Sequence, residues 1–534
     1  MAQVCARLDG IPLALELAAA RLGALSVEEV AGRLGDRFAL LTGGSRWARP
    51  RQQTLRATMD WSWELLSQPE RVLLRRLAVF AGGWTLTAAE AVCGDEETAV
   101  LTPEAVLDLL AALVSKSLVH VSKREGQSRY SLLETVRQYG QERLAEAGEM
   151  IALRDRHLAW CMALAEEAAP RLSGPEQGSW LARLDTEHDS LRAALGWAGE
   201  RGAGEERLRL TGALWRFWYM RGHLSEGRRW LAIALAGSEQ GSPAVRAIAL
   251  IGSGALALQQ GDYAPARVLH EEALALRRTL GDTQGIAAAL NSLGNVAYRQ
   301  GDYARAAALY EESLALKRAV GDRGGIAVAL DNLGNVAYRQ CDYARAATLH
   351  EEALALRRTL GDNRGIAYSL DNQGLAAQAQ GDHGWAAALH EEALALRRAL
   401  EDTWGIAASL SNLGNVAHQQ GDYARALALH EESLRLSRDI GTRDLVAAGL
   451  ECLAWVAALQ QRLRRAARLG GAAEGLRQAL GVPLWPEERA GHERALQAMR
   501  ATLGEEAFAA IWASGVALAP EQAVAEALAV DPGS

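Results

Sequence analysis

Lysine is nearly absent from this sequence: Lys116, Lys123 and Lys317 are the three lysines among 534 residues, and arginine carries the remaining basic charge. A phosphate-binding P-loop requires a Gly-Lys-[Ser/Thr] segment, because its lysine reaches the nucleotide phosphates. None of the three lysines follows a glycine, so the sequence excludes a standard P-loop. It also lacks a zincin motif, a nucleophile elbow and a catalytic triad. We therefore expect a non-enzymatic protein with no catalytic residue and no cofactor.

Cysteine is scarce as well, and long apolar runs are missing. The five cysteines are odd in number, far apart and without the spacing of metal ligands, so they predict neither a disulfide framework nor a metal site. No apolar run approaches the length of a membrane span, and Asp9 and Glu16 interrupt the apolar stretch near the N-terminus. That interruption is not the pattern of a signal peptide. The expected location is the cytoplasm, with no membrane partner.

A forty-residue unit recurs from about Gly261 to the region of Gln460. Each copy opens on Gly-Asp-Tyr-Ala-x-Ala or a variant of it, and ten residues later it reads Glu-Glu-(Ala/Ser)-Leu-(Ala/Arg)-Leu. Self-similarity at this period is typical of stacked helical hairpins, each of which buries its apolar face against its neighbours. Because such a solenoid presents a long surface, we expect this protein to bind a partner.

Each copy resembles the tetratricopeptide repeat in its longer variant of about forty residues. The resemblance rests on Leu-Gly in the first helix, on the Gly-Asp-Tyr turn and on a small alanine in the second helix, as in Leu333-Gly334 and Ala346. Such glycines and alanines stand where two helices approach most closely, because a larger side chain would clash there. One copy departs from the pattern, with Gln373-Gly374 in place of Leu-Gly.

In tetratricopeptide repeats the first helix of each hairpin lines the concave groove. The resemblance places on that face side chains that recur every forty residues, and we expect their asparagines to face solvent in the free protein. Asparagine offers donors and an acceptor to the backbone of an extended peptide. The alternative is that these asparagines only satisfy neighbouring helices; we favour a peptide or protein partner. The predicted partner-binding residues are Asn291, Asn295, Tyr298, Arg299, Asp331, Asn335, Tyr338, Arg339, Asn415 and His418.

Histidine also recurs with the repeat, at His270, His350, His390 and His430, and Tyr310 takes its place once. Residues on successive hairpins lie too far apart to share one metal ion. The pattern therefore favours packing between helices over metal binding. The recurrent Glu-Glu pairs are interpreted as a solvated face.

A different pattern precedes the repeats. Helix starts are predicted at Ser67-Gln68-Pro69-Glu70, at Thr87 to Glu90 and at Thr102-Pro103. Two short β-like runs follow, at 118–122 and 129–132, and a helix over 134–147 closes the segment. This order describes a winged helix. The predicted fold is therefore mainly α: an α-solenoid of tetratricopeptide-like helical hairpins preceded by a winged-helix domain with a small β-hairpin.

Several segments resemble STAND/NB-ARC signalling ATPases. Residues 7–18, RLDGIPLALELA, closely resemble the Gly-x-Pro motif of the first helical domain after the P-loop core. Residues 54–63 (TLRATMDWSW), 76–83 (RLAVFAGG) and 130–139 (YSLLETVRQY) are similar to their winged-helix domain. The bacterial branch, large transcriptional or signalling regulators, continues into tetratricopeptide repeats, and residues 469–508 resemble its C-termini. The chain thus resembles the C-terminal part of a bacterial STAND/NB-ARC-type regulator.

By this resemblance Pro12 would touch a nucleotide held by a P-loop core that this sequence lacks. The family's Met-His-Asp trio, whose histidine senses the β-phosphate, falls on Leu132-Leu133-Glu134. Leu133 cannot donate that hydrogen bond, which argues against nucleotide sensing. The resemblance implies that the sequence begins inside the first helical domain. We expect the C-terminal part of a longer regulator, either truncated in evolution or split by gene calling.

The expected domains follow from these motifs. Residues 1–50 form a helical remnant of the NB-ARC-type ATPase module, and 51–148 form the winged helix. Residues 149–240 form a helical linker with a degenerate repeat, 241–460 the repeat solenoid and 461–534 a C-terminal helical cap.

The leading hypothesis is a non-enzymatic protein-interaction and sensor arm of a bacterial signalling or transcriptional regulator, with the winged helix as relay. One alternative is part of a nucleotide-switch ATPase, whose NB-ARC-type P-loop module is supplied in cis by a missing N-terminal segment or in trans by a separate chain. Another is DNA binding through the winged helix. A net charge of −8 and the carboxylates Asp60, Glu64 and Glu70 argue against nucleic acid as a partner of this chain alone. The arginines available for DNA would be Arg46, Arg49, Arg51, Arg56, Arg71, Arg75 and Arg76.

Overall fold

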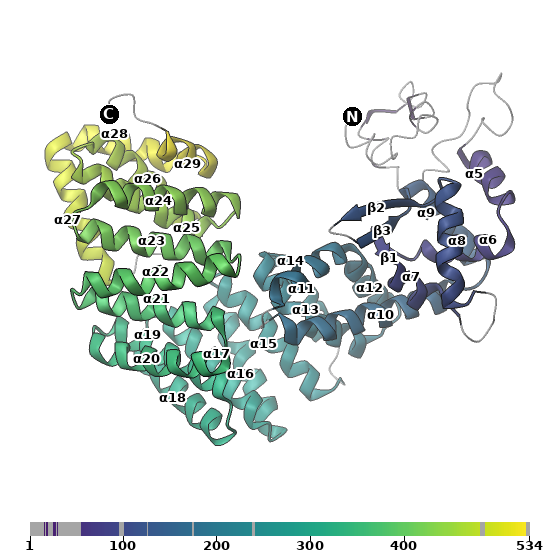
Figure 1. The fold of residues 1–534 in the computed structure, drawn as a ribbon, viewed down its shortest axis with the longest axis horizontal. Coiled ribbons are helices and arrows are strands. Elements are labelled where there is room, and N and C mark those ends of the chain that lie inside the picture. The colour runs from purple at the N-terminus through teal and green to yellow at the C-terminus, as the bar shows by residue number, and fades with distance from the viewer. Residues whose placement is uncertain are drawn as a thin grey trace. The chain divides into compact units, whose positions relative to one another are not determined.

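The computed structural model describes residues 55–95, 101–124, 127–172, 176–237, 241–480 and 486–529, and a few positions between 15 and 32. The chain divides into two compact units, Met1–Gly252 and Ser253–Ser534. Both consist mainly of helices (Figure 1). No helix in the described ranges is long and apolar enough to cross a membrane. Pro12 and most of the predicted helical remnant at 1–50 lie outside the described residues.

The first unit begins with a winged helix. Its elements are α5 (Leu55–Glu64), α6 (Gln68–Leu77), β1 (Gly83–Thr85), α7 (Leu86–Cys93), α8 (Pro103–Ser115), β2 (His120–Arg124), β3 (Gln127–Ser131) and α9 (Glu134–Glu146). The predicted capping box starts α6, where the backbone N–H of Ser67 donates to Glu70 Oε2 over 2.7 Å. The buried core includes Phe80 and Trp84, whose rings stack 5.4 Å apart.

The sheet has three strands, one more than the predicted hairpin. Strands β2 and β3 pair antiparallel as expected, and β1 adds to the other edge of β3, with Trp84 opposite Tyr130. Three residues are too few to show strand alternation in a sequence. Helix α7 begins earlier than the predicted start at Thr87, because β1 runs directly into it. Its N-cap is Thr85, whose Oγ1 accepts a hydrogen bond from the Ala88 N–H over 3.2 Å.

The remainder of the first unit is helical. It contains α10 (Met150–Arg171), α11 (Gln177–Thr186), α12 (His188–Glu200), α13 (Gly204–Arg221) and α14 (Leu224–Ala236), followed by α15 (Pro243–Gln259), which runs into the second unit. Helices α13 and α14 form a hairpin that turns at Gly222, whose φ is +73°. Glycine suits this left-handed conformation because it has no Cβ.

The second unit stacks helical hairpins in sequence order. First helices are α17 (Thr283–Arg299), α19 (Arg323–Arg339), α21 (Asn363–Ala379), α23 (Thr403–Gln419) and α25 (Arg443–Leu459). Second helices are α16 (Tyr263–Thr279), α18 (Tyr303–Ala319), α20 (Tyr343–Leu360), α22 (His383–Ala399), α24 (Tyr423–Asp439) and α26 (Leu463–Leu480). From α16 to α26, each helix packs against the next one in the sequence.

A recurring Gly-Asp pair ends one helix and begins the next. Gly301 has φ +79°, and the following Asp302 accepts a hydrogen bond from the Arg305 N–H over 3.1 Å. An aspartate in this position satisfies one of the free N–H groups at a helix N-terminus. The pair recurs at both ends of the hairpins, which explains why helices of nearly equal length alternate along the stack.

Three more helices follow the stack: α27 (Pro486–Leu503), α28 (Glu505–Val516) and α29 (Pro520–Leu528). Pro486 and Pro520 are the first residues of α27 and α29, a position that proline tolerates because the N–H it lacks would be unpaired there. Helix α29 returns to pack against α24 and α25, and it buries Val524 there.

Candidate functional site

The first helices of the hairpins each keep one partly exposed stripe, which we call the first-helix face. In α17 it consists of Gln284, Ala288, Asn291, Asn295 and Arg299, spaced three or four residues apart, as on one side of a helix. Residues forty and eighty positions later continue it on α19 and α21, and further multiples extend it to α23 and α25. Most of the residues predicted to bind a partner lie on this face.

Hydrogen bonds join the face from one helix to the next. Asn332 Nδ2 donates to Asn291 Oδ1 over 3.0 Å, which links α19 to α17, and Arg339 Nε donates to the Tyr298 hydroxyl over 3.1 Å across the same pair. Asn335 Nδ2 donates to the hydroxyl of Tyr368 on α21 over 3.1 Å. The face is therefore a continuous surface that crosses successive hairpins.

The predicted asparagines are half-buried and hold internal hydrogen bonds, so the expectation that they face solvent freely is wrong. Asn295 Oδ1 accepts from the Tyr310 hydroxyl over 2.8 Å, and Asn415 Oδ1 accepts from Cys452 Sγ over 3.6 Å. Each amide has one polar atom without a partner among the described residues: Nδ2 in Asn295 and Asn415, and Oδ1 in Asn335. These asparagines therefore satisfy polar groups of neighbouring helices.

Aromatic pairs border the face at the turn between first and second helix. Tyr298 lies 5.7 Å from Tyr303, and Tyr338 lies 5.4 Å from Tyr343, between ring centroids. His418 and Tyr423 repeat the arrangement at 5.9 Å, and burial lowers the pKa of His418. The predicted residues Tyr298, Tyr338 and His418 therefore occupy equivalent places.

Asp331 holds the Asn291 position of the stripe on α19, but its side chain is buried, and its predicted role in partner binding is corrected. The side chain is 1% exposed, and its carboxylate lies 3.0 Å from His350 Nδ1 and 2.7 Å from Arg357 Nη2. Ser369, from the next first helix, donates to it over 3.0 Å. A buried carboxylate needs such partners, and they turn Asp331 into the stack rather than toward a ligand.

The same buried cluster occurs once more, one hairpin further. Asp371 lies 2.7 Å from His390 Nδ1 and 2.6 Å from Arg397 Nη1, and Ser409 donates to it over 3.1 Å. The sequence contained a signal for both: an aspartate followed by arginine 26 positions later and serine 38 positions later. Where Asn291 replaces the aspartate, Lys317 and Ala329 stand at those positions.

The recurrent histidines pack between helices, as predicted. His270, His350, His390 and His430 are at most 1% exposed, and each ring lies against the glycine of a first helix. A Cβ added to Gly414 would lie 2.5 Å from His430 Cε1. Among the described residues no group of three or more His, Cys, Asp or Glu side chains could hold a metal ion.

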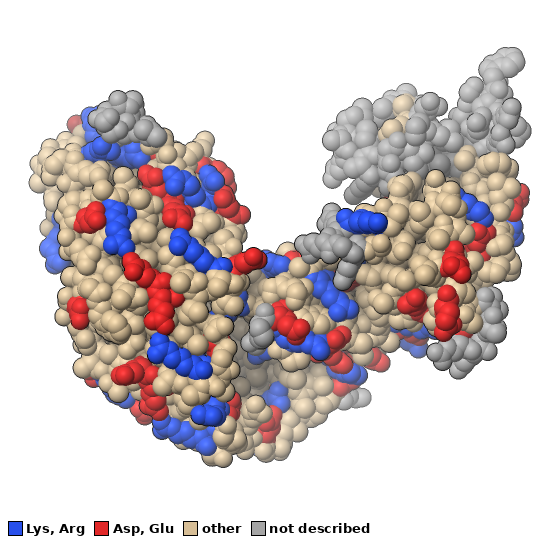
Figure 2. Space-filling view, viewed as in Figure 1, with Lys and Arg blue, Asp and Glu red and all other residues tan. Residues whose placement is uncertain are grey.

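The Glu-Glu pairs lie on the exposed side of the second helices, as interpreted. Figure 2 shows acidic and basic side chains alternating over these helices. Arg345 Nη2 lies 3.4 Å from Glu311, and Arg425 Nη2 lies 2.8 Å from Glu391, each pair joining successive second helices. Exposed pairs of this kind contribute little individually. Trp385 stands where an arginine would pair with Glu351, and Arg358, 3.0 Å from Glu392, joins α20 to α22.

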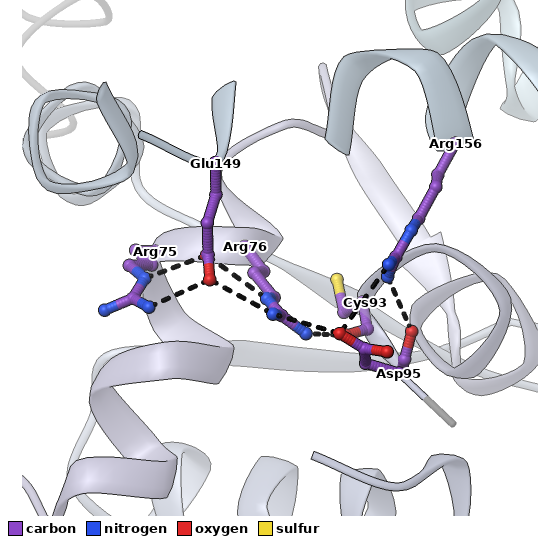
Figure 3. Close-up of polar contacts among 7 residues, drawn as sticks. Arg75, Arg76, Cys93, Asp95, Glu149 and Arg156 are labelled. Carbon is purple, nitrogen blue, oxygen red and sulfur yellow. Dashed lines mark hydrogen bonds and ion pairs between the residues drawn. The ribbon is translucent and has the colours of Figure 1, made fainter. Parts of the chain in front are cut away.

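The arginines proposed for DNA binding are held inside the winged helix by other groups. Arg75 and Arg76 both reach Glu149, at 3.0 and 3.1 Å, and Arg76 also lies 3.7 Å from Asp95, which Arg156 approaches from α10 (Figure 3). Burial by itself would raise the pKa of Glu149, but the hydrogen bonds from Arg75 and Arg76 outweigh it and lower this pKa. The charges of Arg75 and Arg76 are therefore paired with carboxylates, and the pairs with Glu149 join α6 to the start of α10.

The other arginines and the exposed side of α8 give DNA binding no support. Arg71 donates to the backbone carbonyls of Trp63 and Glu64, and Arg56 pairs with Glu142; Arg46, Arg49 and Arg51 lie outside the described residues. In helix-turn-helix proteins the recognition helix enters the major groove with polar and basic side chains. Helix α8 contains no arginine or lysine, and it exposes Glu104, Leu107, Asp108 and Ala111.

Two family models match the chain. Residues 66–145 match the winged helix-turn-helix domain, and residues 245–319, 325–399 and 405–479 match the tetratricopeptide repeat. The chain therefore carries a winged helix-turn-helix domain followed by tetratricopeptide repeats. The winged helix and the tetratricopeptide repeats that the sequence predicted are confirmed by these matches.

Parts of the chain are similar to two mycobacterial proteins. The chain is 42% identical over 302 residues to a Mycobacterium tuberculosis (strain ATCC 25618 / H37Rv) protein provisionally named HTH-type transcriptional regulator Rv0890c, across 54% of this chain and 33% of that protein. It is 48% identical over 155 residues to uncharacterized protein Rv0894 of the same strain, across 29% of this chain and 39% of that one. The chain thus spans about a third of the first relative.

Parts of the chain are also similar to two solved structures at low sequence identity. A STAND protein with a tetratricopeptide repeat sensor from Pyrococcus horikoshii is 13% identical and has a TM-score of 0.45, over 93% of this chain and 74% of that one. A Rap protein complexed with competence and sporulation factor is 15% identical, with a TM-score of 0.42, over 64% and 99%. At these values the similarity carries no functional conclusion.

Proposed function

We propose that this chain is the protein-interaction and sensor arm of a bacterial signalling or transcriptional regulator, and that the first-helix face binds a peptide or protein partner. The observation that carries the proposal is the continuous face itself, in which Asn295, Asn335 and Asn415 each keep one free amide group. Such groups at regular intervals suit the backbone of an extended chain, whose donors and acceptors also recur regularly. The name of the mycobacterial relative supports the setting of a regulator.

The winged helix acts in this proposal as a relay rather than as a DNA reader. Arg129 on β3 pairs with Glu187 between α11 and α12, at 2.5 Å, and also donates to the Thr186 carbonyl. With the link from α6 to Glu149, two ionic contacts tie the winged helix to α10–α12. A displacement of those helices would therefore move the winged helix with them.

The test selects peptides from a random phage-displayed library on the purified chain and measures their affinity for two variants. The first carries Asn295→Ala, Asn335→Ala and Asn415→Ala. The control carries Thr279→Ala, Thr348→Ala and Thr359→Ala, three exposed neutral polar residues of the second helices. We expect the asparagine variant to bind the selected peptides less tightly, because each lost hydrogen bond contributes about 0.5–1.5 kcal/mol, and the control to bind them unchanged.

Thermal unfolding of both variants separates binding from stability, since the asparagines also bond to Tyr310, Tyr368 and Cys452. Equal affinity of the wild type and a folded asparagine variant would show that the partner binds elsewhere. Failure to select any peptide from the library would contradict peptide binding by this chain.

A further inference from the structure

Five glutamates recur every forty residues on the exposed side of the second helices. They are the first members of the Glu-Glu pairs: Glu271, Glu311, Glu351, Glu391 and Glu431. Three of them pair with an arginine of the next second helix, 34 positions further along the chain, as Glu311 does with Arg345. Glu431 pairs with Arg435 of its own helix, at 2.7 Å. Four of the five carboxylates therefore hold an arginine of this chain.

Glu351 differs from the other four because the residue 34 positions further along is a tryptophan. One turn before and after it on α20 stand Ala347 and Ala355, so its own helix supplies no cation at those places. Arg345 and Arg358, the exposed arginines of α20, pair with other glutamates. Within the described ranges no hydrogen bond or ion pair holds the Glu351 carboxylate, so this exposed side chain keeps its charge unpaired.

The tryptophan is Trp385 on α22. Its side chain is 52% exposed, more than that of any other tryptophan, tyrosine or phenylalanine in the described part of the chain. The register between α20 and α22 places it next to Glu351, because Arg358 on α20 lies 3.0 Å from Glu392 on α22, again across 34 positions. Trp385 thus occupies the place from which an arginine reaches the equivalent glutamate in other hairpins. Ala388, one turn further on, is too short to cover the indole.

A carboxylate beside an indole is suited to a guanidinium. The carboxylate accepts two parallel hydrogen bonds from the guanidinium, and the ring face attracts the flat cation. Both contacts occur elsewhere in this chain: the equivalent glutamates pair with arginines, and Arg183 lies 4.7 Å from the ring centroid of Trp180. A lysine ammonium lacks the flat fork of donors, so it fits such a pair less well.

We propose that Glu351 and Trp385 form a docking point for an arginine side chain of a protein partner, on the exposed side of α20 and α22. The partner's guanidinium takes the place that an arginine of this chain takes in other hairpins, and the unpaired carboxylate favours that charge. Tryptophan and arginine are also among the residues that most often dominate binding at protein interfaces. This surface belongs to the second helices and is distinct from the first-helix face, so it does not depend on the proposed peptide binding there.

The test selects peptides from a random phage-displayed library on the whole chain. Phage that bind the variant Trp385→Arg are discarded first, because this variant supplies Glu351 with the arginine of the other hairpins and removes the indole. We expect the peptides that bind only the wild type to share an arginine. In a fluorescein-labelled synthetic copy, replacing that arginine by citrulline should weaken binding about tenfold in fluorescence polarisation, because citrulline keeps the shape and loses the charge. Replacement by lysine should weaken binding as well.

Two single variants test the two side chains, each against a matched control. Glu351→Gln should weaken binding of the selected peptide about tenfold, whereas Glu391→Gln should not, because Glu391 already pairs with Arg425. Trp385→Ala should weaken binding too, whereas Trp404→Ala, which is 47% exposed on a first helix, should not. The citrulline peptide should bind Glu351→Gln no more weakly than it binds the wild type, because both changes remove the same ion pair.

The docking point can also be moved to the preceding hairpin. Arg345→Trp, added to Trp385→Arg, places an indole next to Glu311, which also has alanines one turn before and after it, Ala307 and Ala315. We expect this double variant to bind the selected peptide again. Thermal unfolding should show both variants folded like the wild type, since exposed ion pairs contribute little to stability. A folded double variant that does not bind the peptide would contradict the proposal.

Three other results would overturn the proposal: selected peptides that share no arginine, no peptide that distinguishes the wild type from Trp385→Arg, or equal binding by Glu351→Gln. The variant with Asn295→Ala, Asn335→Ala and Asn415→Ala separates the two surfaces, and it should bind these peptides like the wild type. If it bound them less tightly while Glu351→Gln bound them unchanged, the peptides would lie on the first-helix face. The docking point would then be wrong and the proposed function would stand.

Discussion

The imidazole of His350 lies against Gly334 so closely that a Cβ on the glycine would come within 2.5 Å of the ring carbon Cε1. The glycine is in a first helix, α19, and the histidine is in the following second helix, α20. Their contact explains why the two residues recur together, sixteen positions apart, at Gly254 with His270 and at Gly414 with His430. Gly294 meets Tyr310 in the same way, so any flat ring fills the place.

We expect Gly334→Leu to destabilise the solenoid by roughly 1–3 kcal/mol, because the added side chain overlaps the His350 ring in a packed interface. The loss of stability should extend to neighbouring hairpins, since stacked repeats stabilise one another. Thermal and urea unfolding measure it. Gly324→Ala, in the same helix but with its nearest neighbouring atom 3.8 Å away, is the control and should be neutral or slightly stabilising. An unchanged melting temperature for Gly334→Leu would contradict this packing.

Asp331→Ala should cost about 3–5 kcal/mol, because it leaves the buried Arg357 without its carboxylate. Another hairpin of the same chain shows a different solution, in which Asn291, Tyr310, Lys317 and Ala329 occupy the equivalent positions. The fourfold variant Asp331→Asn, His350→Tyr, Arg357→Lys, Ser369→Ala reproduces that set. We expect it to lose much less stability in urea unfolding than Asp331→Ala alone. If the fourfold variant were the less stable one, the four residues would not act as one unit.

Acid should weaken the solenoid through two of its histidines. Burial lowers the pKa of His270 and of His430 from 6.5 to about 4. A pKa lower in the folded state means that the unfolded chain binds the proton more readily, so stability is fully present above pH 6.5 and is lost as the pH falls toward 4. Each histidine can account for up to about 3 kcal/mol.

The corresponding measurement is urea unfolding between pH 7.5 and 4.5 for the wild type and for His430→Tyr, which copies the ring that Tyr310 supplies three hairpins earlier. We expect the variant to lose less stability over this interval. Parallel curves for the two proteins would show that His430 is not protonated on unfolding in this range.

The isolated chain should not bind ATP or ADP with micromolar affinity and should not hydrolyse ATP. The reason is the absence of a Gly-Lys pair for the phosphates, together with Leu133 where the resembled family has a histidine. Isothermal titration calorimetry with each nucleotide measures this directly. A micromolar dissociation constant corresponds to about 8 kcal/mol, which would require a phosphate site that the sequence motifs do not reveal, and it would contradict the prediction.

Much of the repeat architecture was predictable because its signals are local. A Gly-Asp pair indicates where one helix ends and the next begins, and the small residues Gly334 and Ala346 indicate the side on which two helices meet. The third strand of the winged helix was not predictable, since β1 has three residues and exists only because β3 offers it an edge. The start of α7 was misplaced for the same reason.

The same distinction holds for the candidate surface, of which one part was predictable from the sequence and another was not. The sequence by itself determined the forty-residue period, the alternation of helices and the columns that recur along them, because turns and caps depend on neighbours in the chain. Only the tertiary structure decided that Asp331 is buried while Asn335, four residues away, stays partly exposed. That difference depends on Arg357 and Ser369, which stand 26 and 38 positions further along the chain, and on the half-buried contacts that only stacked hairpins bring together.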